Sequence, residues 1–138
     1  MPKTLHALFA SLCLLAACTP AEPDGAQADE ASGTELFVMV QIPESIEPLE
    51  RGSKYEDPLN AALQAQGLGE VTGGGTQLGP PKADGSSEIT SVDIDVDLVD
   101  AERGLPALRA ELKKLNPPKG TELTYEGKDG EVIKEVLW

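Results

Sequence analysis

The sequence predicts an α+β domain in which one antiparallel sheet carries two helices on one face. Residues 91–100 predict a strand with one buried and one wet face, because residues 91–98 alternate strictly between polar and apolar side chains. Two stretches with helical spacing, near residues 58–66 and 106–115, lie between strand-like segments. The resulting order is β-α-β-β-α-β with one more strand at the end, and such an order favours an α+β architecture.

The folded part is expected to begin with an inner strand. Leu36 to Ile42 is rich in β-forming residues and is apolar on both faces until Gln41. Prolines follow, and residues 44–54 are expected to form a loop in which Ile46 and Leu49 contact the core.

A helix is expected to begin at Asp57 and Pro58. Aspartate can cap the free N–H groups of a first turn, and proline fits the first helical position. Gly67 is expected to end the helix in a left-handed conformation. Residues 70–78 predict a strand that three glycines at 73–75 interrupt. We expect these glycines to form a bulge, or a bend where a helix or loop passes close, with a ligand approaching the exposed backbone as the alternative.

The second half predicts a hairpin, a helix and two further strands. A polar loop at residues 82–87 precedes the alternating strand of residues 91–100, and a leucine stripe marks a helix at 106–115. Residues 122–126 and 131–137 predict two strands joined by a turn with an Asp-Gly step. The whole order resembles the ferredoxin-like βαββαβ fold, an antiparallel sheet with two helices on one face, here with an extra C-terminal strand. That fold hosts many functions and indicates none by itself.

The first 18 residues have the layout of an export signal. A short polar stretch with Lys3 precedes an apolar stretch from Ala7 to Ala17. This stretch is too short to remain in a bilayer, which needs about 20 apolar residues. Residues 15–18, Leu-Ala-Ala-Cys, resemble the lipobox of bacterial lipoproteins. An ordinary signal that is cleaved after Ala17 is the alternative.

The resemblance implies an address and an attachment point. In that family the signal, here residues 1–17, is removed, and the thiol of the cysteine, here Cys18, carries acyl chains such as palmitate. Each buried CH₂ of such a chain contributes about 0.8 kcal/mol to membrane binding. Thr19 rather than aspartate comes next, which favours the outer membrane if the source has two membranes. Residues 18–34 lack apolar periodicity and predict a disordered linker, so residues 35–138 are expected to form one small monomeric domain in the cell envelope.

The composition excludes several classes of function. The only histidine is His6 and the only cysteines are Cys13 and Cys18, so the processed chain has no imidazole and no free thiol. Catalysis and metal binding by these groups are therefore excluded, and we expect no enzyme activity and no cofactor. The formal net charge is −13, which disfavours nucleic acid and makes a basic protein or cations the natural partners, although an acidic surface also serves solubility alone.

Three features are candidate partner-binding sites. Asp93, Asp95 and Asp97 are expected to form a wet acidic row, which either only solvates the sheet or binds a partner. A metal site there is disfavoured, because neighbours on one strand face are about 6.5–7 Å apart. Tyr55 lies beside a charged cluster and could contact a partner. The terminal Trp138 either closes the core or anchors a partner.

Together these observations favour a lipid-anchored, exported binding module without catalytic activity. The alternative is a toxin-neutralising, immunity-type lipoprotein, because small acidic envelope domains that cap basic toxins have this general profile. A carboxylate-dependent enzyme is the third class.

Overall fold

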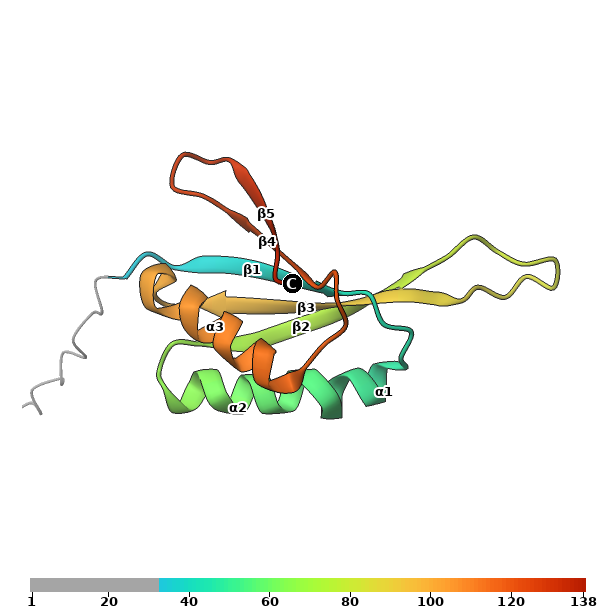
Figure 1. Ribbon diagram of the computed structural model, residues 1–138, viewed down its shortest axis with the longest axis horizontal. Coiled ribbons are helices and arrows are strands. Elements are labelled where there is room, and N and C mark those ends of the chain that lie inside the picture. The colour runs from blue at the N-terminus through green and yellow to red at the C-terminus, as the bar shows by residue number, and fades with distance from the viewer. Residues whose placement is uncertain (1–32) are drawn as a thin grey trace, which may run out of the picture.

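An antiparallel sheet of five strands forms the framework of residues 33–138, the part of the chain that the computed structural model describes (Figure 1). The strands lie in the order β2-β3-β1-β4-β5, and every neighbouring pair is antiparallel. This sheet and its helices confirm the α+β prediction. The strands are β1 (Leu36–Ile42), β2 (Gly69–Leu78), β3 (Ile89–Leu98), β4 (Glu122–Glu126) and β5 (Val132–Val136).

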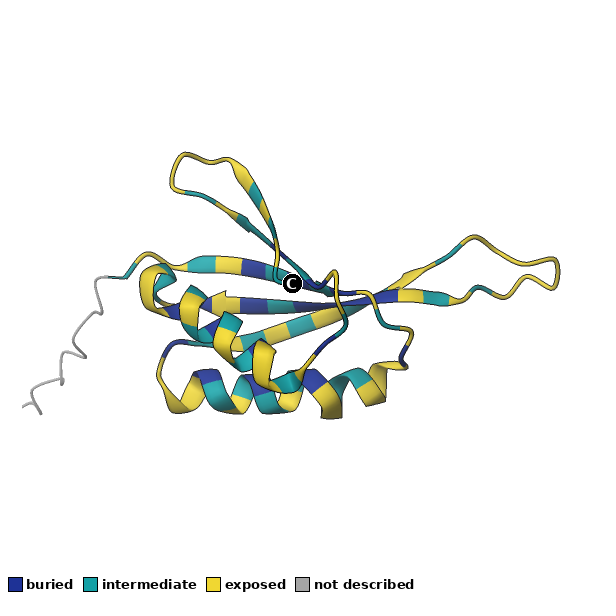
Figure 2. Ribbon diagram, viewed as in Figure 1, coloured by how far each residue is buried: buried dark blue, intermediate teal, exposed yellow. Residues whose placement is uncertain are grey.

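The core lies between one face of the sheet and the helices (Figure 2). Every second residue of the central strands β1 and β3 points into it, as the alternation in β3 predicted. Burying one aliphatic side chain of this kind contributes about 1.5–3 kcal/mol, so this layer is the main source of stability. Its fully buried members include Val38, Val40, Val92, Ile94 and Val96 from the sheet and Leu59, Leu63, Leu108 and Leu112 from the helices.

The first helix begins earlier than the sequence predicted. It is continuous through three segments, namely α1 (Pro48–Arg51), the π-helical η1 (Gly52–Glu56) and α2 (Asp57–Ala65). The predicted loop at residues 44–54 is therefore wrong over its second half, and Asp57 does not act as the cap. Pro58 lies inside the helix instead of starting it. A proline there removes a hydrogen bond and collides with the preceding turn, and the π-helical turn directly before it absorbs that disruption.

The flanks of this helix show which predicted core contacts form. Ile46 is buried as expected, but Leu49 is 89% exposed, because α1 buries none of its residues. Gly67 has a φ of 62°, and the N–H of Leu68 donates to the carbonyl oxygen of Leu63 at 3.0 Å. This is the hydrogen bond of a glycine-dependent helix stop, so the predicted end of the helix is confirmed.

The second helix, α3 (Ala101–Leu115), also begins before its predicted start at Pro106. Asp100 is its cap, since the Oδ1 atom accepts hydrogen bonds from the N–H groups of Glu102 and Arg103 at 2.9 and 3.2 Å. An aspartate in this role satisfies donors that no carbonyl of the helix can reach. Pro106 consequently lies inside the helix.

The glycines of β2 allow the first helix to approach the sheet. The expected interruption of the strand by the glycines is wrong, because β2 is continuous and all three glycines pair with β3. The register of β2 against β3 shifts just before them, between Val71 and Gly73, so the irregularity lies next to the glycines and not within them. A Cβ atom on Gly74 would lie 2.8 Å from the carbonyl oxygen of Asp93 and 3.0 Å from the Nε atom of Arg51. Only glycine fits at such a distance, so the expectation of a close approach is confirmed.

Candidate functional site

The second face of the sheet carries no helix among residues 33–138. Strand residues that alternate with the buried ones point to this side, and Figure 2 shows them as exposed or intermediate along β1. On this open face Phe37 of β1 lies opposite Asp97 of β3, and Met39 lies opposite Asp95. Phe37 is 53% exposed. The inner position of β1 is confirmed by its neighbours β3 and β4, but its second apolar face is open.

The aspartate row lies on this open face with three different degrees of burial. Asp97 is exposed and Asp95 is half-buried, whereas Asp93 is only 6% exposed. The prediction of a wet face is therefore right for Asp97 and wrong for Asp93. The side chain of Gln77 on β2 covers Asp93, and its Nε2 atom donates to the Oδ2 atom at 2.7 Å.

The other carboxylate oxygen of Asp93 has no such partner. Its Oδ1 atom is buried and accepts no hydrogen bond from any residue of the described part. A buried polar atom in this state costs about 1–3 kcal/mol. Within residues 33–138, no group of three or more histidine, cysteine, aspartate or glutamate side chains is placed to hold a metal ion.

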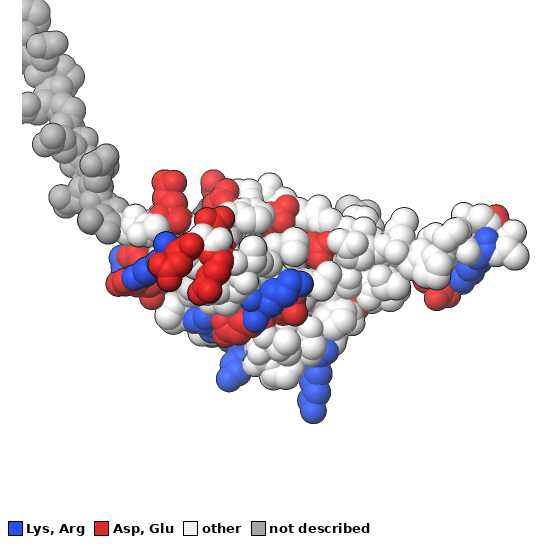
Figure 3. Space-filling view, turned by 90° about the horizontal axis from the view of Figure 1, so that it is seen from above, with Lys and Arg blue, Asp and Glu red and all other residues white. Residues whose placement is uncertain are grey.

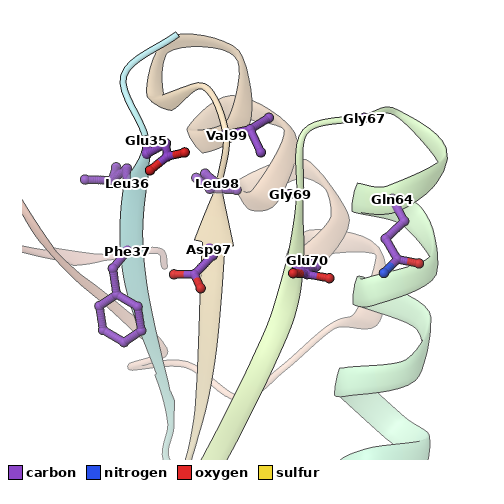
Figure 4. A pocket seen from close by; sticks show the side chains of 10 residues that line it. All are labelled: Glu35, Leu36, Phe37, Gln64, Gly67, Gly69, Glu70, Asp97, Leu98 and Val99. Atoms are coloured by element: carbon purple, nitrogen blue, oxygen red, sulfur yellow. The ribbon is translucent and has the colours of Figure 1, made fainter. Parts of the chain in front are cut away.

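One end of the open face contains a hollow of about 670 Å³ (Figure 4). Phe37, Asp97 and Glu70 lie next to one another there on β1, β3 and β2. Figure 4 shows these side chains in front of the sheet, with α3 behind it. Glu35 is a third carboxylate in the lining, and the lining contains no basic side chain. The hollow therefore attracts cationic groups.

A second hollow of about 750 Å³ opens between β1, the start of α3 and the β4–β5 hairpin. β4 pairs with β1 only from Val38–Tyr125 to Gln41–Glu122, and Figure 1 shows the hairpin diverging from β1 beyond that pairing. Side chains from both faces of the sheet can then line the opening, which we call the hairpin groove. Its apolar lining comprises Leu36, Phe37, Met39, Ala101, Leu105, Tyr125, Val132 and Ile133.

Acidic side chains surround the hairpin groove. Glu35, Glu102 and Glu126 line it, and Lys128 is the basic residue of the lining. The Nζ atom of Lys128 lies 3.3 Å from the Oε1 atom of Glu102, but both side chains are more than 80% exposed, so water and salt weaken their attraction. Figure 3 shows red side chains gathered at the end of the molecule where the described chain begins. The groove thus combines an apolar floor with an acidic rim.

An ion pair fastens the hairpin beside the groove. The Nε and Nη2 atoms of Arg109 on α3 donate to the two carboxylate oxygens of Glu135 on β5, at 2.8 and 2.6 Å. Hydrogen bonding to this guanidinium lowers the pKa of Glu135 below its usual value. The two-point contact fixes the base of the hairpin against the helix.

Tyr55 and Trp138 do not project into solvent. Tyr55 is fully buried, and its hydroxyl donates to the Oε2 atom of Glu44 at 2.6 Å. Burial, together with that hydrogen bond, raises the pKa of Tyr55 to about 12. The expectation that Tyr55 offers its ring to a partner is wrong for this reason. Trp138 packs against the core, and its indole N–H donates to the carbonyl oxygen of Pro117 at 3.2 Å, so it closes the core edge.

The predicted lipid attachment lies outside the described residues. The predicted signal, Cys18 and residues 19–32 belong to the part of the chain for which no structure is described. Within residues 33–138, no helix is both long and apolar enough to cross a membrane.

Comparison of the chain with protein families, curated proteins and solved structures finds no match. Its function is therefore inferred from its own residues. From the sequence, Phe37 was assigned to a buried strand and the hairpin groove was not expected. The sequence nevertheless contained an indication of the open apolar face. A sheet that is covered on one side only leaves the second face of a strand exposed, even where that face is apolar.

Proposed function

We propose that this chain is an exported, lipid-anchored domain that binds a basic protein partner and catalyses no reaction. The observation that carries the proposal is the open face of the sheet, where exposed apolar side chains lie among carboxylates and no helix of the described part covers them. Monomeric proteins rarely leave such patches uncovered unless they bind something. The lipobox-like residues 15–18 support the anchor.

The charge of the chain supports a basic partner. The formal net charge is −13, and removal of a signal that contains Lys3 and no acidic residue would make it one unit more negative. A field of this sign raises the association rate of cationic partners and repels nucleic acids and anionic lipid surfaces. A toxin-neutralising lipoprotein is the special case in which the basic partner is a toxin.

The absence of catalysis is supported by the side chains that remain. Residues 33–138 contain no histidine and no cysteine, and the ionisable groups that line the two hollows are carboxylates, one lysine and the hydroxyl of Tyr125. Carboxylates alone serve as acid and base in some hydrolases, so a carboxylate-dependent enzyme is the remaining catalytic alternative.

For the fold, we propose a ferredoxin-like arrangement that is extended by one strand. The first four strands have the spatial order β2-β3-β1-β4, with one helix between β1 and β2 and another between β3 and β4. Two interleaved βαβ units produce such an order. The sheet differs from a four-stranded one by β5, which pairs with β4 at the edge.

The anchor is tested by fractionating cells that produce the chain with Cys18→Ala. We expect this variant in the soluble fraction, or as an uncleaved precursor, while the unaltered chain stays with the membrane. Cys13→Ala is the matched control, because it removes a thiol from the apolar stretch without touching the lipobox cysteine. Normal processing and membrane retention of the Cys18 variant would contradict the proposal.

The basic partner is tested by replacing Asp93, Asp95 and Asp97 together by asparagine. We expect envelope proteins captured by the unaltered domain to bind this variant more weakly, and their binding to the unaltered domain to weaken as salt rises. The melting temperatures of the unaltered domain and of the asparagine variant are also measured with Ca²⁺ and with a chelator. If Ca²⁺ raises the melting temperature of the unaltered domain by many degrees and this rise disappears in the variant, the aspartates bind a metal ion and not a protein partner.

A further inference from the structure

The hairpin groove exposes apolar surface that the fold itself leaves without a cover. Phe37 is 53% exposed and Val132 is 69% exposed, and they line the same opening from β1 and from β5. Pairing of β1 with β4 ends at Val38 and Tyr125, so no backbone of residues 33–138 bridges the gap beyond this point. A concave opening between apolar walls is the usual form of a site that receives an inserted side chain.

The rim of the groove selects the charge of what enters. Its lining holds the carboxylates of Glu35, Glu102 and Glu126 against the single ammonium group of Lys128. The hollow shown in Figure 4 lies on the other side of Phe37 and is also negatively charged, because Glu70 and Asp97 line it. Cationic groups next to an apolar side chain would match both parts of this surface, and a neutral lipid chain would match only the apolar part.

The segment between Cys18 and the described domain does not supply this complement. Residues 19–32 contain four acidic residues and no lysine or arginine. Two copies of the chain would each carry a formal net charge of −13, and the repulsion between them opposes self-association. The occupant with the right chemistry is therefore a different protein.

We propose that the hairpin groove is the docking site for a segment of a partner protein that inserts an apolar side chain flanked by lysine or arginine. This proposal rests on the proposed function, which needs a basic partner, and it adds where that partner binds and what it inserts. Phe37 and Val132 form the two apolar walls. Glu102 and Glu126 face the flanking cations.

The test uses three six-residue peptides and the full chain carrying Cys18→Ala, so that lipid does not enter the measurement. The first peptide has Phe-Leu between two pairs of arginines, the second has Phe-Leu between two pairs of glutamates, and the third has Ser-Ser between two pairs of arginines. Binding is measured by titration, with backbone amide shifts of the protein recorded at each step. We expect only the first peptide to saturate, with shifts concentrated on the groove residues and an affinity that falls as salt rises.

Val132→Ser and its matched control Val136→Ser separate the groove from the rest of the strand. Both valines lie on β5 and are 69% and 60% exposed, but only Val132 lines the groove. We expect the first variant to weaken peptide binding about tenfold, as loss of an apolar wall does in other interfaces. The control should change it less than about twofold.

The rim is tested in the same way with paired glutamates. Glu102→Gln combined with Glu126→Gln should weaken binding about tenfold and flatten its salt dependence. Glu47→Gln combined with Glu50→Gln removes the same charge near α1, at the other end of the molecule (Figure 1), and should leave binding nearly unchanged.

Other outcomes overturn the proposal. Equal binding of the arginine and glutamate peptides would show a generic apolar hollow, and binding of a fluorescent fatty acid in place of the peptides would assign it to lipid. Self-association that Val132→Ser abolishes would assign the groove to a second copy. Absence of peptide binding, while captured envelope partners still depend on the three aspartates, would reject the groove and leave the proposed function standing. If no peptide binds and partner capture does not depend on the three aspartates, the proposed binding module itself is rejected.

Discussion

Substitution of Gly74 by alanine tests how tightly this residue of β2 is packed against β3 and against the side chains of the first helix. The added Cβ atom would lie 2.5 Å from the Oε1 atom of Glu56 and 2.8 Å from the carbonyl oxygen of Asp93, distances at which one side must move. The side chain of Glu56 can rotate away, but the carbonyl oxygen belongs to the backbone of the central strand β3, so β2 must shift against β3. Overpacking of this kind typically costs about 1–3 kcal/mol.

The assay is urea unfolding followed by the fluorescence of Trp138, the only tryptophan of the chain. With a slope of about 1–3 kcal/mol per molar urea, a loss of about 2 kcal/mol moves the midpoint by roughly 1 M. Gly75→Ala is the matched control, since its Cβ atom would lie 3.4 Å from the Oδ2 atom of Asp93, an ordinary contact on the open face. Alanine there should change the free energy of unfolding by less than about 1 kcal/mol. Equal losses at both glycines would refute the close approach.

Three further predictions concern the core and the ionisable groups. Leu108→Ala should lower the free energy of unfolding by about 2–5 kcal/mol, because the side chain is fully buried, whereas Asp95→Asn should cost little, since it relieves like-charge repulsion; equal large losses in urea would contradict this contrast. The pKa of Glu135 is lowered by its hydrogen bond with Arg109, so its stabilisation is present above the usual value of 4.5 and fades as the pH falls below it. Glu135→Gln should therefore flatten the acid side of a plot of stability against pH, and an unchanged profile would show that the pair adds nothing. The pKa of Tyr55 is raised to about 12, so its contribution to the stability of the fold is complete below pH 10 and is lost as the pH rises towards 12. Tyr55→Phe should remove this loss of stability at alkaline pH. If the variant still loses stability there, another group titrates.

The sheet could be predicted from the sequence because its signals are local. Alternation in residues 91–98, the apolar run of residues 36–42 and the turn at residues 127–130 each specify a strand or a turn without reference to the rest of the chain. The structure places all of these where they were predicted, within a residue or two at the ends.

The helix starts could not be placed from the prolines. Pro58 and Pro106 both suit a first helical turn, yet both lie inside helices that begin earlier. Packing of the helices against the core outweighs the lost hydrogen bond, and in the first helix a π-helical turn relieves the collision. Asp100 was the better guide to the start of α3, because an aspartate before a helical run is a strong capping signal.

The candidate site could not be predicted because it depends on how distant segments meet. Burial of Asp93 follows from Gln77 on the neighbouring strand. Burial of Tyr55 follows from the helical segment η1, which begins within the loop that the sequence predicts. The hairpin groove exists because the pairing of β1 with β4 ends at Val38, a feature of tertiary register. No local pattern in the sequence encodes where such a pairing stops.

The proposed lipid anchor and the proposed docking groove are tested together by photo-crosslinking in the cells that produce the chain. A photoreactive amino acid is placed at position 132 in the groove, and at positions 136 and 49 as exposed controls, where Val136 and Leu49 are 60% and 89% exposed. We expect a membrane-associated adduct with a basic protein from position 132, reduced by Glu102→Gln with Glu126→Gln, and little from the controls. Equal adducts at all three positions, or none at position 132 while a control position captures a partner, would contradict a docking site in the groove.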